Sequence, residues 1–70
     1  MAREHLAEAN KHIEEAEAQI AGQTALITEL AADGHDTMEA EELLESFIAT
    51  LDTMQRHRET ILSELNNSKF

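Results

Sequence analysis

The sequence predicts an all-α protein, an antiparallel two-helix hairpin that pairs with a second copy to form a four-helix bundle. The 70 residues include no proline and two glycines, and helix-favouring residues such as Ala, Glu and Leu supply much of the chain. Apolar residues recur at helical spacing in two long stretches, which a short glycine-containing segment separates. More apolar residues are present than a contact between two helices can cover, and this surplus is the reason to expect a second copy.

The first helix is predicted over about residues 3–32. From Leu6 onwards, apolar residues alternate three and four positions apart, which is the spacing of a heptad repeat with positions a to g. The a positions hold Leu6, Ile13, Ile20 and Ile27, and the d positions hold Ala9, Ala16, Gln23 and Leu30. These eight residues form one stripe along the helix, in which Gln23 is polar.

Residues 33–36 are predicted to form the turn. Gly34 can adopt the left-handed conformation that ends a helix, and Asp36 or Thr37 can cap the next one. The Gly-His-Asp-Thr string is therefore interpreted as chain reversal and capping rather than as a functional loop.

The second helix is predicted over about residues 37–65, followed by a polar tail at residues 66–70. Its stripe consists of Ala40, Leu44, Phe47, Leu51, Met54, Arg58, Ile61 and Leu65. A loop of a few residues requires the two helices to lie antiparallel and adjacent, so residues 1–70 are expected to form a single domain.

Residues whose numbers sum to about 70 or 71 are expected to face each other across this hairpin. Gln23 is then opposite Phe47, and Arg58 is opposite Ile13. The Arg58 guanidinium is expected to reach Glu14 or Glu17 while its aliphatic stem packs in the seam.

Four apolar residues near the loop are the predicted dimer interface, because the seam of a single hairpin cannot cover all of them. They are Leu26, Leu43, Phe47 and Ile48. A second hairpin is the simplest cover, since a four-helix bundle buries wider faces than a helix pair does.

The charge of the chain argues against several classes of partner. Fifteen acidic and five basic residues give a net charge of −10, which disfavours nucleic acid and anionic membrane surfaces. No apolar run approaches the roughly 20 residues of a membrane span, and the N-terminus lacks the apolar stretch of a signal peptide. We therefore expect a cytoplasmic protein. The absence of cysteine excludes disulfides and thiol chemistry.

Histidine is the residue type with most potential for chemistry. His5, His12 and His57 all occupy g positions, which meet across an antiparallel pair, so they are candidate ligands for a transition metal. The string His57-Arg58-Glu59 resembles the start of the phosphoacceptor box in one group of sensor histidine kinases, which suggests phosphotransfer at His57.

No serine has a His and an acid at a triad spacing, and two phenylalanines are too few to line a cofactor pocket, so neither catalysis nor a cofactor is predicted.

A wider resemblance covers most of the chain. Its residues include His5, His12-Ile13, Ile20, Gln23, Leu30, Gly34-His35-Asp36-Thr37, Ala40, Leu43-Leu44, Phe47 and His57-Arg58. In this pattern the chain resembles short helical-hairpin proteins of bacteria, particularly the α-proteobacteria, a family to which no activity is assigned. The resemblance implies a cytoplasmic bacterial helical hairpin and no functional residues.

The function expected from the sequence is therefore non-catalytic. An acidic helical dimer can act as an adaptor or regulator that binds a partner protein through its charged surface. The alternatives are a signalling module with phosphotransfer at His57 and a metal-binding bundle built on the three g-position histidines.

Overall fold

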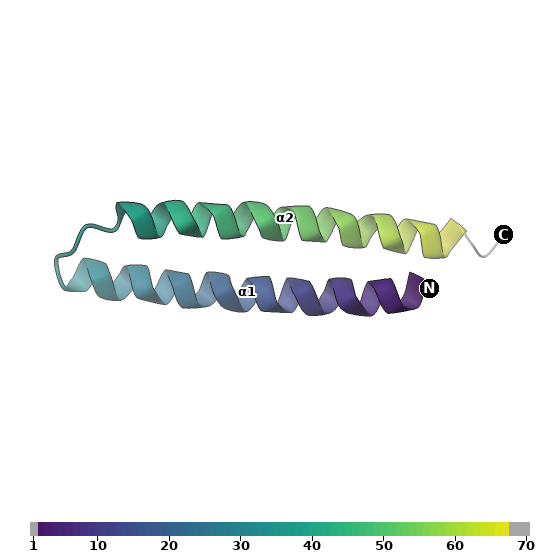
Figure 1. Cartoon of the computed structure of the whole chain (residues 1–70), viewed down its shortest axis with the longest axis horizontal. Helices are drawn as coiled ribbons and strands as arrows, with labels where there is room; N and C mark the ends of the chain where they lie inside the picture. The colour runs from purple at the N-terminus through teal and green to yellow at the C-terminus, as the bar shows by residue number, and fades with distance from the viewer. Residues whose placement is uncertain (1, 68–70) are drawn as a thin grey trace.

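The chain forms two long antiparallel helices that lie side by side. The computed structural model describes residues 2–67, with α1 at Ala2–Ala32 and α2 at Met38–Asn67. Figure 1 shows a straight hairpin in which the start of α1 and the end of α2 lie at the end opposite the loop. Its principal extents are 58 × 15 × 12 Å. The helical hairpin predicted from the heptads is confirmed. Asn66 and Asn67, predicted to belong to the tail, are helical, and residues 68–70 lie outside the described part of the chain.

Helix α1 ends in a Schellman motif centred on Gly34. This glycine has φ 78°, its N–H donates to the carbonyl of Ala31 at 3.1 Å, and the N–H of His35 donates to the carbonyl of Leu30 at 2.9 Å. The left-handed conformation is open to glycine because it carries no Cβ, and the two bonds satisfy carbonyls that the helix end leaves free. The predicted helix stop is confirmed in its conformation.

Helix α2 begins with an Asp36 cap. A carboxylate oxygen of Asp36, Oδ1, accepts a hydrogen bond of 3.0 Å from the backbone N–H of Met38, and the carbonyl of Thr37 accepts the next helical bond, from Glu41. Thr37 is therefore the N-cap residue, and the Asp36 side chain caps the N–H of Met38 from the position before it, where its negative charge also lies at the positive end of the α2 dipole.

Burial follows the predicted heptads. Ala9, Ala16 and Ile61 are the buried residues among those described, and the rest of the stripe is half-buried apart from Arg58, which is exposed. No side chain in residues 3–67 is completely enclosed. One hairpin therefore has a line of contact rather than a closed core, as expected for a chain of this size.

The register across the hairpin differs from the predicted one. The side-chain amide of Gln23 donates a 2.8 Å hydrogen bond to the carbonyl of Ala40, seven residues before its predicted neighbour Phe47. In Figure 1, α1 reaches further toward the loop end than α2, because the connection runs back along the hairpin before α2 begins. The chain therefore does not reverse symmetrically about residue 35, as the prediction assumed.

The register that fits these observations places each a residue of one helix level with a d residue of the other, so that paired numbers sum to 67. Phe47 is then level with Ile20, and Ile61 with Leu6. This arrangement also accounts for Thr37, which is half-buried although it precedes the predicted stripe, because it lies level with Leu30.

Candidate functional site

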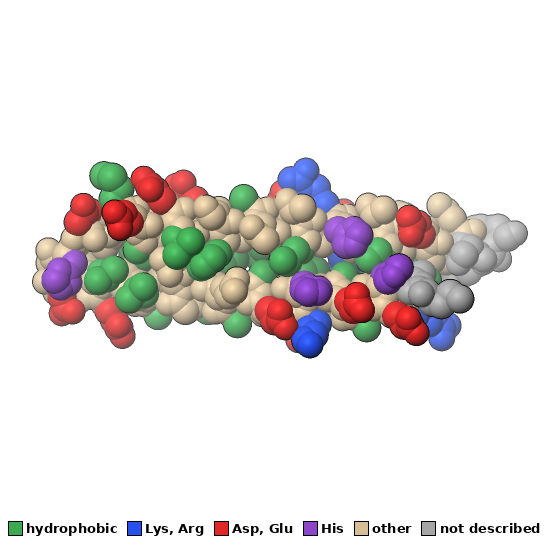
Figure 2. All heavy atoms as spheres, viewed as in Figure 1, with side chains coloured by type: hydrophobic (Ala, Val, Ile, Leu, Met, Phe, Trp, Pro, Cys, Tyr) green, Lys and Arg blue, Asp and Glu red, His purple; other side chains and the backbone are tan. Residues whose placement is uncertain are grey.

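The side of the hairpin that carries most of the potentially functional residues is formed by the g positions of both helices. We call it the His–Leu flank. It consists of His5, His12, Gln19 and Leu26 of α1 and Leu43, Thr50, His57 and Glu64 of α2. In Figure 2, three histidine side chains gather toward the termini on the visible face, and hydrophobic side chains lie along the same face nearer the loop. The g positions of two antiparallel helices meet along one side of the seam, which explains this grouping.

The three g-position histidines are exposed. They share one side of the hairpin, as their heptad positions predict. Within residues 2–67, however, no group of three or more His, Asp or Glu side chains is arranged so that it could hold a metal ion. The metal site at His5, His12 and His57 therefore stays a prediction, and binding would require these exposed side chains to change rotamer.

The predicted dimer-interface residues occupy two sides of the seam. Leu26 and Leu43 are 43% and 46% exposed and belong to the His–Leu flank. Ile48, at an e position, is 50% exposed on the other flank, and Phe47 is half-buried in the seam between them. The exposed leucines thus form an apolar patch on the His–Leu flank, nearer the loop than the histidines, and Ile48 lies on the opposite flank.

Charge is segregated along the hairpin. Residues 29–45, which we call the acidic loop end, carry seven carboxylates, all exposed, and no lysine or arginine. They are Glu29, Asp33, Asp36, Glu39, Glu41, Glu42 and Glu45. The four basic residues of the described part lie nearer the termini, as Arg3, Lys11, Arg56 and Arg58. Acidic side chains are also visible at the loop end of the face in Figure 2.

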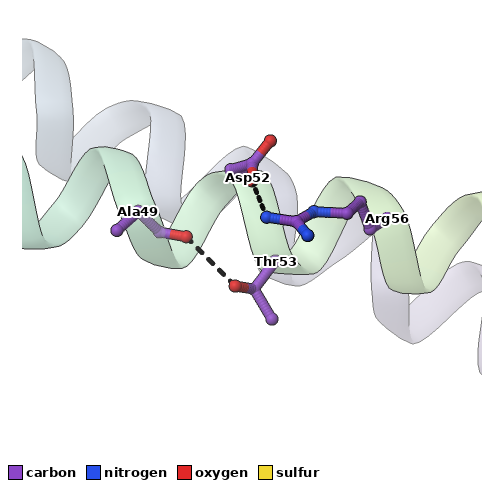
Figure 3. A network of polar contacts seen from close by, with 4 residues as sticks. All are labelled: Ala49, Asp52, Thr53 and Arg56. Atoms are coloured by element: carbon purple, nitrogen blue, oxygen red, sulfur yellow. Dashed lines mark hydrogen bonds and ion pairs between the residues drawn. The ribbon is translucent and has the colours of Figure 1, made fainter.

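Local contacts already occupy part of this basic charge. Figure 3 shows Arg56 paired with Asp52 one turn earlier on the same helix, beside a 3.2 Å hydrogen bond from the Thr53 hydroxyl to the carbonyl of Ala49. An exposed pair of this kind contributes about 0.3 to 0.5 kcal/mol. Within residues 2–67, Arg58 makes no ion pair, so the predicted contact with Glu14 or Glu17 is absent there.

Sequence reasoning found the histidines and the exposed leucines but missed the charge segregation. The signal was present, since no lysine or arginine occurs between Lys11 and Arg56. The segregation becomes evident only in the hairpin, because the stretch without lysine or arginine contains the loop and therefore forms one end of the rod.

No protein-family model, curated protein or solved structure matches the chain. Neither helix in residues 2–67 combines the length and apolar character required to cross a bilayer.

Proposed function

We propose that this chain is a non-catalytic, dimeric helical adaptor or regulator that binds a basic partner protein through its acidic surface. The observation that carries the proposal is the acidic loop end, where seven exposed carboxylates lie on one end of a rod without a lysine or arginine. Such a surface attracts a basic patch over distances of about 10 Å at moderate ionic strength and raises the association rate.

The geometry of the acidic loop end supports binding by surface contact. Glu39, Glu42 and Glu45 occupy positions c, f and b of α2, which point away from the seam. They are free to meet a partner while the seam side of the hairpin contacts a second copy. A bacterial cytoplasmic setting, which the family resemblance implies, belongs to the same proposal.

The test is capture of partners from a native host lysate with two variants of equal net charge. In the first, Glu39, Glu42 and Glu45 become glutamine. In the second, Glu8, Glu15 and Glu59, nearer the termini, become glutamine. We expect a basic protein that the parent chain and the second variant retain and that the first variant loses, with binding that weakens as salt increases. Equal retention by both variants would contradict the proposal.

Phosphotransfer at His57 is the second candidate. The observation in its favour is that His57 is exposed on the side of α2, where a kinase could reach the imidazole. Incubation with a host kinase extract should then yield an acid-labile phosphate on the parent chain and none on His57→Gln. His35→Gln, which alters an exposed histidine in the turn, is the control.

A further inference from the structure

We propose that a second copy docks antiparallel on the His–Leu flank, so that the loop of each hairpin lies beside His12 and His57 of the other. This inference rests on the dimeric part of the proposed function and adds the interface and the orientation.

The His–Leu flank changes character in regular steps. Three levels follow one another at intervals of seven residues on each helix, Asp33 and Asp36 extend the series into the turn, and His5 with Glu64 continues it toward the termini. From the loop toward the termini, the levels hold Asp33 and Asp36, then Leu26 and Leu43, then Gln19 and Thr50, then His12 and His57. We refer to them as the acidic, leucine, polar and histidine levels. The series thus runs from carboxylates at the loop to imidazoles nearer the termini.

A parallel arrangement of two copies would place each level against itself. The acidic level of one copy would meet the acidic level of the other, and the two acidic loop ends would bring fourteen carboxylates together at the end farther from the lysine and arginine side chains. Like charges in contact across an interface oppose association. Most carboxylates of the acidic loop end lie farther than a Debye length of about 10 Å from any lysine or arginine of the described chain, so no positive charge offsets their repulsion.

An antiparallel arrangement makes the levels complementary. A two-fold axis midway between the leucine and polar levels also lies about midway between the acidic and histidine levels, because the helical levels are evenly spaced and Asp33 follows directly after α1. The carboxylates of each copy then lie beside the imidazoles of the other, which can donate hydrogen bonds to them. A two-fold dimer uses the same surface on both copies, so the contact forms twice.

The position of this axis also suits the apolar surface. It passes near the level of Gly22 and Gln23, so the two hairpins overlap along most of their length. The exposed Leu26 and Leu43 of each copy then lie near the centre, beside Gln19 and Thr50 of the other copy and roughly 10 Å along the rod from its leucines. The outward carboxylates, such as Glu39 and Glu42, stay on the surface of the dimer. Dimerisation and binding of a basic partner are therefore compatible.

Pulsed electron–electron distance measurements on spin-labelled single-cysteine variants test the orientation, since the chain has no cysteine of its own. The labels are placed at His35→Cys in the loop and at Ala25→Cys on the outer side of α1 near the proposed axis. The antiparallel dimer predicts a loop-to-loop distance of roughly 37 Å and an axial offset of roughly 8 Å between the labels at residue 25. Short distances for both labels would mean a parallel dimer and would overturn the inference while preserving the dimeric adaptor. No distance between copies for either label would remove the dimer itself.

A charge exchange tests the contact between levels. His12→Glu and Asp33→Lys should each raise the dimer dissociation constant, because the first places like charges side by side and the second removes the acceptor of the partner copy's imidazole N–H. The double variant should bind more tightly than the sum of the single effects predicts, by roughly threefold or more. His35→Glu, which adds the same charge outside the flank, is the control, and the helical circular dichroism signal shows whether each variant remains folded. Strictly additive effects in folded variants would overturn the proposed pairing of Asp33 with His12.

Discussion

The side-chain amide of Gln23 on α1 donates to the main-chain carbonyl of Ala40 on α2 at 2.8 Å. This hydrogen bond joins two residues that are 17 positions apart in sequence, and it lies at a d position where the other residues of α1 are apolar. A polar residue in a helix seam specifies one register, because other registers leave its amide without a partner. Gln23 is therefore the residue that distinguishes the observed register from the symmetric one.

Gln23→Ala should lower the free energy of unfolding by about 1 kcal/mol, since a hydrogen bond and part of the seam packing are lost. The carbonyl of Ala40 remains in the backbone ladder of α2, which limits the loss. Gln55→Ala, an exposed glutamine of α2 outside the His–Leu flank, is the control and should change stability by less than about 0.5 kcal/mol. Thermal unfolding at fixed protein concentration measures both. Equal effects would show that Gln23 contributes only as a surface residue.

Gly34→Ala should destabilise the hairpin by about 1 kcal/mol or more. The residue has φ 78°, a conformation that costs an L-amino acid with a Cβ about 1 to 2 kcal/mol. A Cβ at this position would meet no atom within 4 Å, so the cost comes from the backbone and not from a clash. Gly34→Asn should lose less, because asparagine tolerates this region better. Chemical denaturation of the two variants is the measurement, and an unchanged midpoint for alanine would contradict the Schellman assignment.

Gly22→Ala should have the opposite sign. Gly22 lies inside α1, is exposed, and has open space around the position of an added Cβ. Glycine inside a helix is about 1 kcal/mol less favourable than alanine, so the substitution should stabilise the hairpin by about that amount. The two glycine variants thus serve as controls for each other in the same unfolding assay. Destabilisation by Gly22→Ala would indicate that another chain approaches α1 closely at this point.

The sequence predicts the seam of this protein better than its register. Periodicity identifies which side chains face the other helix, because heptad spacing depends only on the geometry of a single helix. The heptads place Leu6 and Leu65 in the seam, and both are half-buried there. Register depends on the path of the five residues that connect the helices, which the pattern does not encode. Phe47 was therefore assigned to the seam correctly but paired with Gln23 instead of lying level with Ile20.

The candidate site shows a similar division. The g positions of His12, His57 and Leu26 follow from the heptads, and their common flank could be predicted. The side-chain geometry of the histidines could not, because exposed side chains on a helix surface retain rotamer freedom and the sequence specifies no partner that orders them. Asp33 continues the seven-residue interval of Leu26, but its level beside the flank could not be predicted, since the heptads do not encode the path of the turn.

Arg58→Leu should leave stability unchanged or raise it by about 1 kcal/mol. Arg58 occupies an a position level with Ala9, is exposed, and makes no ion pair within residues 2–67. A leucine there would extend the apolar seam and bury part of its side chain without a charge to solvate. Arg56→Leu, which removes the paired arginine on the outer face, is the control and should not stabilise the hairpin. A clear loss of stability for Arg58→Leu in thermal unfolding would mean that its charge serves the assembled protein.

Phe47→Ala should cost about 3 to 5 kcal/mol if a second hairpin completes the core around this residue. In the single hairpin Phe47 is only half-buried against α1, so a monomer would lose less, because truncation of a partly exposed ring removes less contact and leaves no cavity. Met38→Ala is the control: its side chain is 62% exposed at the start of α2, and its loss should matter little in either state.

Melting across a dilution series and sedimentation at micromolar concentration distinguish the dimer from the folded monomer. A dimer should melt at lower temperature as it is diluted, and Phe47→Ala should shift it toward dissociated, unfolded chains. A melting temperature that is independent of concentration, together with a small effect of Phe47→Ala, would leave the hairpin as a folded monomer and contradict the four-helix bundle.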